Sequence, residues 1–355
     1  MRLRSSVPYA VLLVCQSVSG APAAAGSPFR AALISGRQTN TATLKQLKRQ
    51  GYNIVALEFV RGALPKARIE QANRIRKAGF QLYYWIEVGR CEELADAHPE
   101  WMASLQGHPE WRRHFPAFPQ PADGEVVKNY PWVSVFYKEA FDAHLHRIKS
   151  LIAPLPKPDG ILLNDLQAAP SACGCGNTLC RWTTDYGPIK TATQLGPDAG
   201  AKFLSEVRKL AAGAEVIPVW TTECQEHEMP KGNACDGVSC FSGICWYDFT
   251  KQLMPVAAES KRIGALLTYK SLGQYPEWID SAVRSFQKMP SVRNGKPIAA
   301  NRILPVLQGW NTTPAERADQ IRRAREAGAT GYIMVLTPIA QSWKPRILKL
   351  PSATR

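Results

Sequence analysis

The stretch Asp159-Gly160-Ile161-Leu162-Leu163-Asn164-Asp165 is a short apolar run that turns polar at its end. A continuous apolar run of this length, bounded by polar residues, is typical of a strand in a parallel sheet whose two faces are both covered by helices. Polar groups at the tip of such a strand face water or a ligand rather than the core. We therefore expect a buried strand whose last residues stand at a functional edge.

Similar runs recur along the chain and alternate with stretches of helical periodicity. One of the helical stretches begins with a capping-box pattern, in which Thr313 and Glu316 flank Pro314 at the first helical position. The expected strands are 31–35, 53–59, 80–87, 160–165, 215–221, 264–269, 302–307 and 331–336. A long excursion, 91–135, separates the third strand from its helix.

This alternation predicts one α/β domain, a single (β/α)8 TIM barrel over residues 26–355. The competing fold is an open, doubly wound sheet. That fold usually carries a glycine-rich phosphate turn after its first strand, and Ser35-Gly36-Arg37 does not supply one.

The N-terminus has the pattern of an export signal. Arg2 and Arg4 precede the apolar stretch 7–14, and Ala23-Ala24-Ala25 offers a cleavage site. We expect a signal peptide over 1–25 and a secreted or periplasmic protein. A membrane anchor would need about 20 apolar residues, and a lipoprotein would use Cys15. We expect no membrane span.

The formal net charge of +15 favours anionic partners such as acidic polysaccharide, envelope lipid or nucleic acid. The other interpretation is general surface charge for solubility, which the scattered positions of the basic residues favour. No nucleic-acid motif is visible, so we expect no nucleic-acid partner. No cofactor is expected.

Cysteines in the loops after strands four and five predict disulfides, because an even number in an exported chain implies pairing. A metal site is the alternative, but zinc sites often use C-x2-C pairs, which are absent. We expect no metal, and disulfide-rich loops at the C-terminal face of the barrel. The cysteines after the signal are Cys91, Cys173, Cys175, Cys180, Cys224, Cys235, Cys240 and Cys245.

Several strands end in carboxylates, which is where barrel enzymes place catalytic groups. We expect Asp165 to act as nucleophile or base and Glu223 as proton donor, because neighbouring strand tips lie close together. Glu87 is a third candidate, although an ion pair with Arg90 is an equal alternative. Asp165 could instead cap its loop or pair with an arginine, and Glu223 could only order its loop. We interpret Glu58 as structural, because Leu57 and Phe59 flank it.

Other polar and aromatic groups near the same edge are candidates for substrate binding. A tryptophan can stack on a sugar ring, although each could equally be packing within a loop. Lys270 could alternatively form a Schiff base, as in aldolase-type barrels. The expected substrate-binding residues are Asn164, Lys270, Gln308, Trp310, Trp182 and Trp246.

Three stretches of the chain together have a recognisable pattern: His98-Pro99-Glu100-Trp101, the strand 159–165, and a loop containing Cys175 and Cys180-Arg181. On these stretches the chain resembles bacterial glycoside hydrolase-like (β/α)8 barrel proteins. The resemblance covers about half of the chain. Those proteins have a paired Asp-Asp at the end of the strand, where this chain has Asn164 before Asp165, and their cysteine loop is shorter. The resemblance implies a barrel fold, secretion and activity on carbohydrate.

We therefore expect a secreted glycoside hydrolase that cleaves a poly- or oligosaccharide by paired-carboxylate catalysis. The alternative is a non-catalytic carbohydrate-binding protein of the cell surface, and a Schiff-base lyase is a third hypothesis. The expected partner is a carbohydrate, and an anionic polysaccharide is the form that a basic surface would attract.

Overall fold

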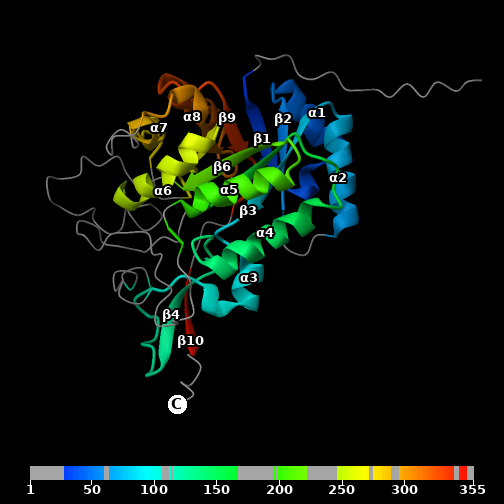
Figure 1. Cartoon of the computed structure of the whole chain (residues 1–355). Helices are drawn as coiled ribbons and strands as arrows, with labels where there is room; N and C mark the ends of the chain where they lie inside the picture. Colours follow the sequence, from blue (N-terminus) through cyan, green and yellow to red (C-terminus); the bar gives the residue numbers. More distant parts are fainter. Residues whose placement is uncertain are drawn as a thin grey trace, which may run out of the picture.

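The protein is described by a computed structural model that covers residues 28–59, 64–105, 112, 115–166, 195–196, 198–221, 246–271, 275–288, 296–339 and 344–349. Within these residues, eight parallel strands close a barrel in the order β1-β2-β3-β5-β6-β7-β8-β9 (Figure 1). The strands are β1 (Arg30–Ile34), β2 (Ile54–Glu58), β3 (Gln81–Glu87), β5 (Gly160–Asn164), β6 (Glu215–Thr221), β7 (Ile263–Leu267), β8 (Ile303–Gln308) and β9 (Tyr332–Val335).

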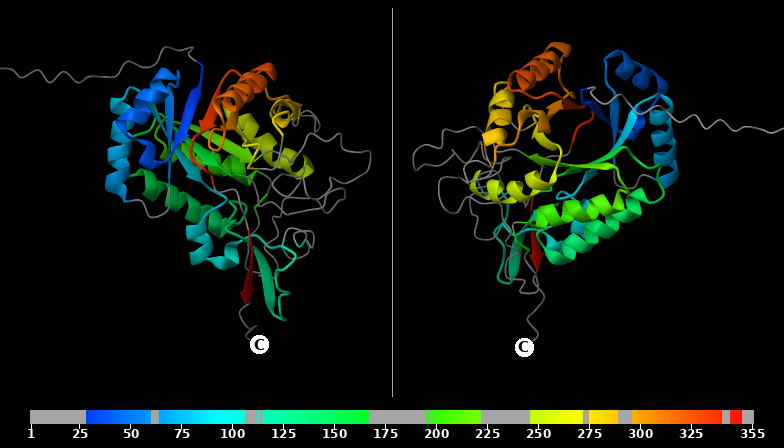
Figure 2. Two further views of the ribbon diagram at one scale, coloured as in Figure 1. Left: turned by 180° about the vertical axis from the view of Figure 1, so that it is seen from behind. Right: turned by 45° about the horizontal axis from the view of Figure 1, so that its top comes forward.

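Helices cover the outside of the barrel, as Figure 2 shows from two further directions. The predicted (β/α)8 barrel is confirmed, and all eight predicted strands form its wall. The longer helices are α1 (Thr41–Arg49), α2 (Pro65–Lys77), α4 (Lys138–Ile152), α5 (Ala199–Leu210), α6 (Trp246–Glu259), α7 (Trp278–Lys288) and α8 (Pro314–Glu326).

The predicted capping box at the start of α8 is also confirmed. The Thr313 hydroxyl accepts a hydrogen bond from the Glu316 amide at 3.2 Å, and the Glu316 carboxylate accepts one from the Thr313 amide at 2.7 Å. Each contact satisfies an amide that the first turn of the helix leaves without a partner.

Two apolar clusters divide the strand residues by their direction. One cluster fills the inside of the barrel, and the other lies between the strands and the helices. On β3, Tyr83 and Trp85 belong to the inner cluster, while Tyr84 and Ile86 belong to the outer one. This alternation follows from the two-residue period of a strand, and it decides which strand-end residues face the mouth of the barrel.

The excursion after β3 forms a small layer of its own beside the barrel. It contains α3 (Glu92–Ala97), the 3-10 helix Pro99–Trp101, and β4 (Glu125–Tyr130). β4 pairs antiparallel with β10 (Lys344–Lys349), so the segment after the last barrel strand returns to this layer (Figure 1). Neither strand of this ribbon was predicted from the sequence.

No helix in the described residues is long and apolar enough to cross a bilayer. The expected signal segment 1–25 lies outside the described residues, so its assignment stays a prediction.

Candidate active site at the mouth of the barrel

The last residues of four barrel strands are polar and point inward. Glu58, Glu87, Asn164 and Gln308 end β2, β3, β5 and β8, and each stands two residues beyond a member of the inner apolar cluster. Since side chains two apart on a strand share a face, these four lie above the apolar interior at the carboxyl end of the barrel. Catalytic groups of (β/α)8 barrels occupy this end.

Glu87 is held by two donors, one on each carboxylate oxygen. The Trp85 indole N–H donates to Oε1 at 2.7 Å, and the Asn164 amide donates to Oε2 at 2.7 Å. Trp85 lies on the same strand and the same face, while Asn164 lies opposite Glu87 in the β3–β5 register. The register between the two strands therefore fixes the orientation of this carboxylate.

Glu58 ends the neighbouring strand β2. It lies opposite Trp85 in the β2–β3 ladder, and Glu87 is the next residue of β3 on the same face as Trp85. Burial, with the nearby charge of Glu87 as a second cause, raises the pKa of Glu58 from 4.5 to about 7. Burial also raises the pKa of Glu87, opposed mainly by the positive charge of Arg90. Both groups have the perturbed ionisation that is common at functional sites.

Our interpretation of Glu58 as structural used its apolar neighbours, which in fact lie on the other face of the strand. Leu57 belongs to the outer cluster and Phe59 packs against that cluster. Leu57 and Phe59 therefore face the helices. Because side chains alternate along a strand, Glu58 between them faces the mouth of the barrel. That signal was present in the sequence.

Asp165 lies immediately beyond β5, where it is fully buried. Its carboxylate forms an ion pair with Arg90 at 2.5 Å, and neither side chain is more than 6% exposed. The backbone of Asp165 turns into the left-handed region, with φ at 54°, which takes it out of the strand. The structure therefore agrees with the alternative in which Asp165 pairs with an arginine. The ion pair of Arg90 is formed with Asp165 and not with Glu87.

Helix α4 supports the end of β3 from behind. Arg147 donates a hydrogen bond to the backbone carbonyl of Glu87 at 2.5 Å. Its guanidinium also lies 3.3 Å from Nδ1 of the buried His144, whose Nε2 is 2.7 Å from the carbonyl of Val133. Burial lowers the pKa of His144 to about 3, so the ring is neutral. The contact of Arg147 with Glu87 was not predicted from the sequence.

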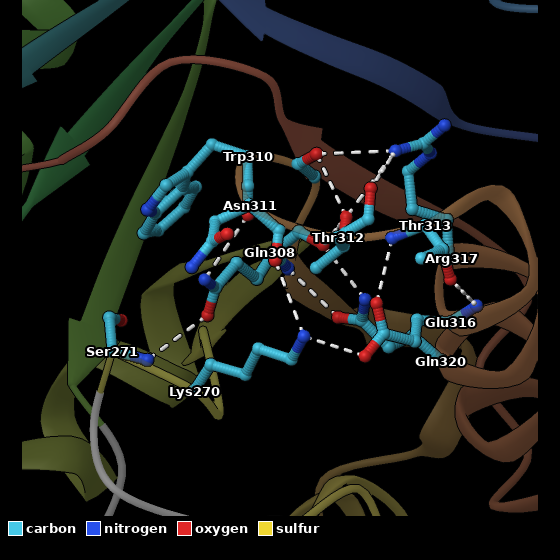
Figure 3. Close-up of polar contacts among 11 residues, drawn as sticks. Lys270, Ser271, Gln308, Trp310, Asn311, Thr312, Thr313, Glu316, Arg317 and Gln320 are labelled. Atoms are coloured by element: carbon cyan, nitrogen blue, oxygen red, sulfur yellow. Dashed lines mark hydrogen bonds and ion pairs between the residues drawn. The ribbon is translucent and has the colours of Figure 1, made fainter.

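The opposite side of the mouth carries Lys270, Gln308 and Trp310 (Figure 3). The Lys270 ammonium lies 2.6 Å from the Glu316 carboxylate and donates to the carbonyl of Asn311 at 3.3 Å. The side chain of Gln308 accepts from the Ser271 amide at 3.1 Å and donates to the Trp310 carbonyl at 3.2 Å. These contacts connect the ends of β7 and β8.

Trp310 is half-buried and packs against the inner apolar cluster. Its loop is fixed by further contacts: Gln320 donates to the carbonyl of Gln308 at 2.7 Å, and Arg317 donates to the carbonyl of Thr312 at 2.6 Å (Figure 3). An aromatic ring at a held position can form a stacking surface.

Of the predicted pair of acids, Asp165 and Glu223, only Asp165 is among the described residues. Glu223 and Trp182 lie outside the described residues, as does the side chain of Trp246, which begins α6. All the predicted disulfide cysteines except Cys91 also lie outside them. Cys91 is a buried free thiol, and the disulfides expected in the two cysteine-bearing loops stay a prediction.

The segment 98–101, which carried part of the family resemblance, serves a packing role in the side layer. The rings of His98 and Trp101 stack with centroids 3.6 Å apart. Trp101 also packs against an apolar cluster that includes Leu94 and Met102. The segment therefore lies with the excursion rather than among the strand-end residues.

The strand order and helical cover define this chain as a (β/α)8 barrel protein. No family model matches the chain, and no curated protein matches it. Within the described residues, no group of three or more histidine, cysteine or acidic side chains could hold a metal ion.

Among solved structures, the chain is similar to an endo-1,4-β-D-mannanase from Thermotoga petrophila RKU-1, with 11% identity and a TM-score of 0.47 over 87% of this chain and 88% of the other. A β-galactosidase from Marinomonas ef1 matches with 10% identity and a TM-score of 0.47, over 88% of this chain and 55% of that one. A sugar phosphate isomerase/epimerase from Parabacteroides distasonis ATCC 8503 matches with 10% identity and a TM-score of 0.39, over 91% of each chain. At such TM-scores these similarities carry no argument about the reaction.

Proposed function

We propose that this protein is a secreted or periplasmic glycoside hydrolase whose mouth carries Glu58 and Glu87 as its working carboxylates. The observation that carries the proposal is the pair itself: two acids on adjacent strands, both facing the carboxyl end of the barrel, both with raised pKa values. Glycosidases use two carboxyl groups that flank the scissile bond, one protonated and one ionised.

The environment of each acid suggests its role. Burial and the nearby charge of Glu87 raise the pKa of Glu58 to about 7, so Glu58 is partly protonated near neutral pH. Glu87 accepts hydrogen bonds on both oxygens, which stabilises its anion. Glu58, with a pKa of about 7, is suited to carry the proton.

The corresponding reaction is cleavage of the bond between the anomeric carbon and the glycosidic oxygen. Glu58 gives its proton to that oxygen, so that the leaving sugar departs as an alcohol. The Glu87 carboxylate either attacks the anomeric carbon to form a glycosyl ester, or takes a proton from an attacking water. A water then resolves the ester in the first case and returns the proton to Glu58.

The other side of the mouth supplies groups for binding. Trp310 offers an aromatic face for a sugar ring, and Lys270 is the cation nearby, held by Glu316 and Asn311 (Figure 3). The buried side chain of Gln308 is occupied by Ser271 and Trp310, so its predicted contact with substrate is a secondary part of the proposal. The net charge of +15 includes Arg2 and Arg4 of the expected signal segment, and the positive charge that remains without them would attract an acidic polysaccharide at long range. Asn164 is occupied by Glu87 and Asp165, so its predicted contact with substrate becomes a secondary part of the proposal.

The test is a reducing-end assay on a panel of neutral and acidic polysaccharides. Glu58→Gln and Glu87→Gln should each lower kcat by about 10²–10⁴-fold, the usual contribution of a positioned acid or base. Glu70→Gln, on the exposed face of α2, is the matched control. Glu223→Gln in the same panel tests the acid that was predicted from sequence. Full activity in both mouth variants would remove Glu58 and Glu87 from the mechanism.

A non-catalytic carbohydrate-binding protein is the second candidate, because donors from the chain already occupy both oxygens of Glu87. Binding on a glycan array without any release of reducing ends would favour it. In that case Trp310→Ala should weaken binding while Glu58→Gln leaves it intact.

A further inference from the structure

Asp165 and Arg90 form a buried ion pair just beyond the ends of β5 and β3. The charged groups lie 2.5 Å apart and the Asp165 side chain has no exposed surface. A buried ion pair costs desolvation energy that its attraction only partly repays, so it is weak evidence for stability. Stability alone therefore does not account for a buried ion pair at this place in the site.

The pair is connected to Glu87 through Asn164. The Nδ2 group of Asn164 donates to Glu87 at 2.7 Å and lies 3.3 Å from Oδ2 of Asp165. One amide nitrogen therefore faces two carboxylates, and the two distances together limit the gap between those oxygens to 6.0 Å. Both carboxylates can only accept hydrogen bonds when ionised. The side-chain amide of Asn164 therefore turns its NH2 group, and not its oxygen, toward Glu87 and Asp165.

The backbone holds these groups in register. Gly89 donates its amide to the carbonyl of Asp165 at 3.0 Å, and Val88 donates to the carbonyl of Asn164 at 2.9 Å. A side chain at position 89 would come within 2.6 Å of that Asp165 carbonyl and 2.9 Å of the Trp132 ring. Only glycine allows the segments that carry Arg90 and Asp165 to approach this closely.

We infer that Arg90, Asp165 and Asn164 form a positioning unit for Glu87, in which Asp165 acts through Asn164 and does not meet the substrate. This inference rests on the proposed function only in treating Glu87 as a catalytic residue. It changes the role expected for Asp165 from nucleophile or base to orientation of a neighbouring amide.

The charged groups that face Glu87 come from three directions. Glu58 approaches from β2, while Arg90 and Asp165 lie beyond the ends of β3 and β5. Arg147 reaches the backbone carbonyl of Glu87 from α4. Loss of the unit should therefore change the ionisation of Glu87 itself, which can be measured without any substrate.

The experiment follows the carboxyl carbon of Glu87 by ¹³C NMR against pH, in protein labelled at the glutamate side-chain carboxyl. Glu87→Gln and Glu58→Gln assign the resonances. Arg90→Gln with Asp165→Asn removes both charges together, because Asp165→Asn alone would leave Arg90 buried without its partner. Asn164→Leu removes the donor and keeps the volume. Thermal melts check that each variant is folded.

We expect the titration midpoint of Glu87 to rise by about one pH unit or more in Arg90→Gln/Asp165→Asn and in Asn164→Leu, because each loses a group that favours the anion. The sign in the double variant follows from Arg90, whose lowering effect exceeds the raising effect of Asp165. The surface pair Arg322→Gln/Glu326→Gln on α8 is the matched control and should leave the midpoint unchanged. If the titration midpoint of Glu87 is unchanged both in Arg90→Gln/Asp165→Asn and in Asn164→Leu, the inference is overturned.

A kinetic arm separates this inference from the proposed function. If a polysaccharide is cleaved, Arg90→Gln/Asp165→Asn should retain measurable kcat with a displaced pH profile, since the amide oxygen introduced at position 165 can still accept from Asn164. Complete loss of activity with an unmoved Glu87 midpoint would instead assign Asp165 to the substrate. A displaced midpoint in a protein that cleaves nothing would support the positioning unit and refute the hydrolase.

Discussion

Replacing Glu58 with Gln should change how the stability of the barrel depends on pH. In the folded protein the pKa of Glu58 is raised from 4.5 to about 7, mainly by burial. The folded state therefore binds this proton more tightly than the unfolded chain does. The stabilisation is complete below pH 4.5 and is lost as the pH rises through about 7. Above that pH, the folded barrel must accommodate a desolvated charge.

The size of the effect follows from the two pKa values. One pKa unit corresponds to about 1.4 kcal/mol, so the rise from 4.5 to about 7 sets an upper limit of about 3 kcal/mol. Gln has nearly the same shape and no proton to lose. The stability of Glu58→Gln relative to wild type should therefore improve by up to about 3 kcal/mol between about pH 4.5 and pH 8.

Urea unfolding, followed by far-UV circular dichroism at several pH values, measures this difference. The m values of the two proteins should agree, so that shifts of the midpoint report stability alone. Glu70→Gln on the exposed face of α2 is the matched control for the loss of one acid. If the curves for Glu58→Gln and wild type run parallel from about pH 4.5 to pH 8, then Glu58 is not a desolvated acid in the mouth.

Three further outcomes test other parts of the structure. Thr313→Ala should cost about 0.5–2 kcal/mol in urea unfolding, because it removes the side-chain acceptor of the α8 capping box. Gly160→Ala should cost about 1–3 kcal/mol or more, since its new methyl group would lie 2.1 Å from the Tyr83 ring inside the barrel, and a normal melting temperature would contradict this packing. Trp310→Ala should weaken glycan binding by about 1–3 kcal/mol in calorimetry while leaving the fold intact, because the ring is half-buried at the mouth; unchanged affinity would exclude it from the binding surface.

The eight strands could be read from local sequence because each is a short apolar run between polar boundaries, and the helices follow from their periodicity and caps. Thr313, Pro314 and Glu316 specify the start of α8 through contacts within one turn. Such features depend only on near neighbours along the chain. The ribbon of β4 and β10 was missed because its strands lie far apart in the sequence and form only by pairing with each other.

The composition of the mouth required the folded barrel. Alternation along β2 could have placed Glu58 among the inward residues, but its partnership with Glu87 depends on the alignment of two strands from different parts of the chain. The pairing of Asp165 with Arg90 is likewise set by the approach of the β3 and β5 ends at Gly89. Local pattern determines whether a residue is in a strand and on which face. Whether a carboxylate there meets a cation, another acid or solvent is decided by through-space neighbours, because electrostatic energy depends on distance and burial rather than on chain order.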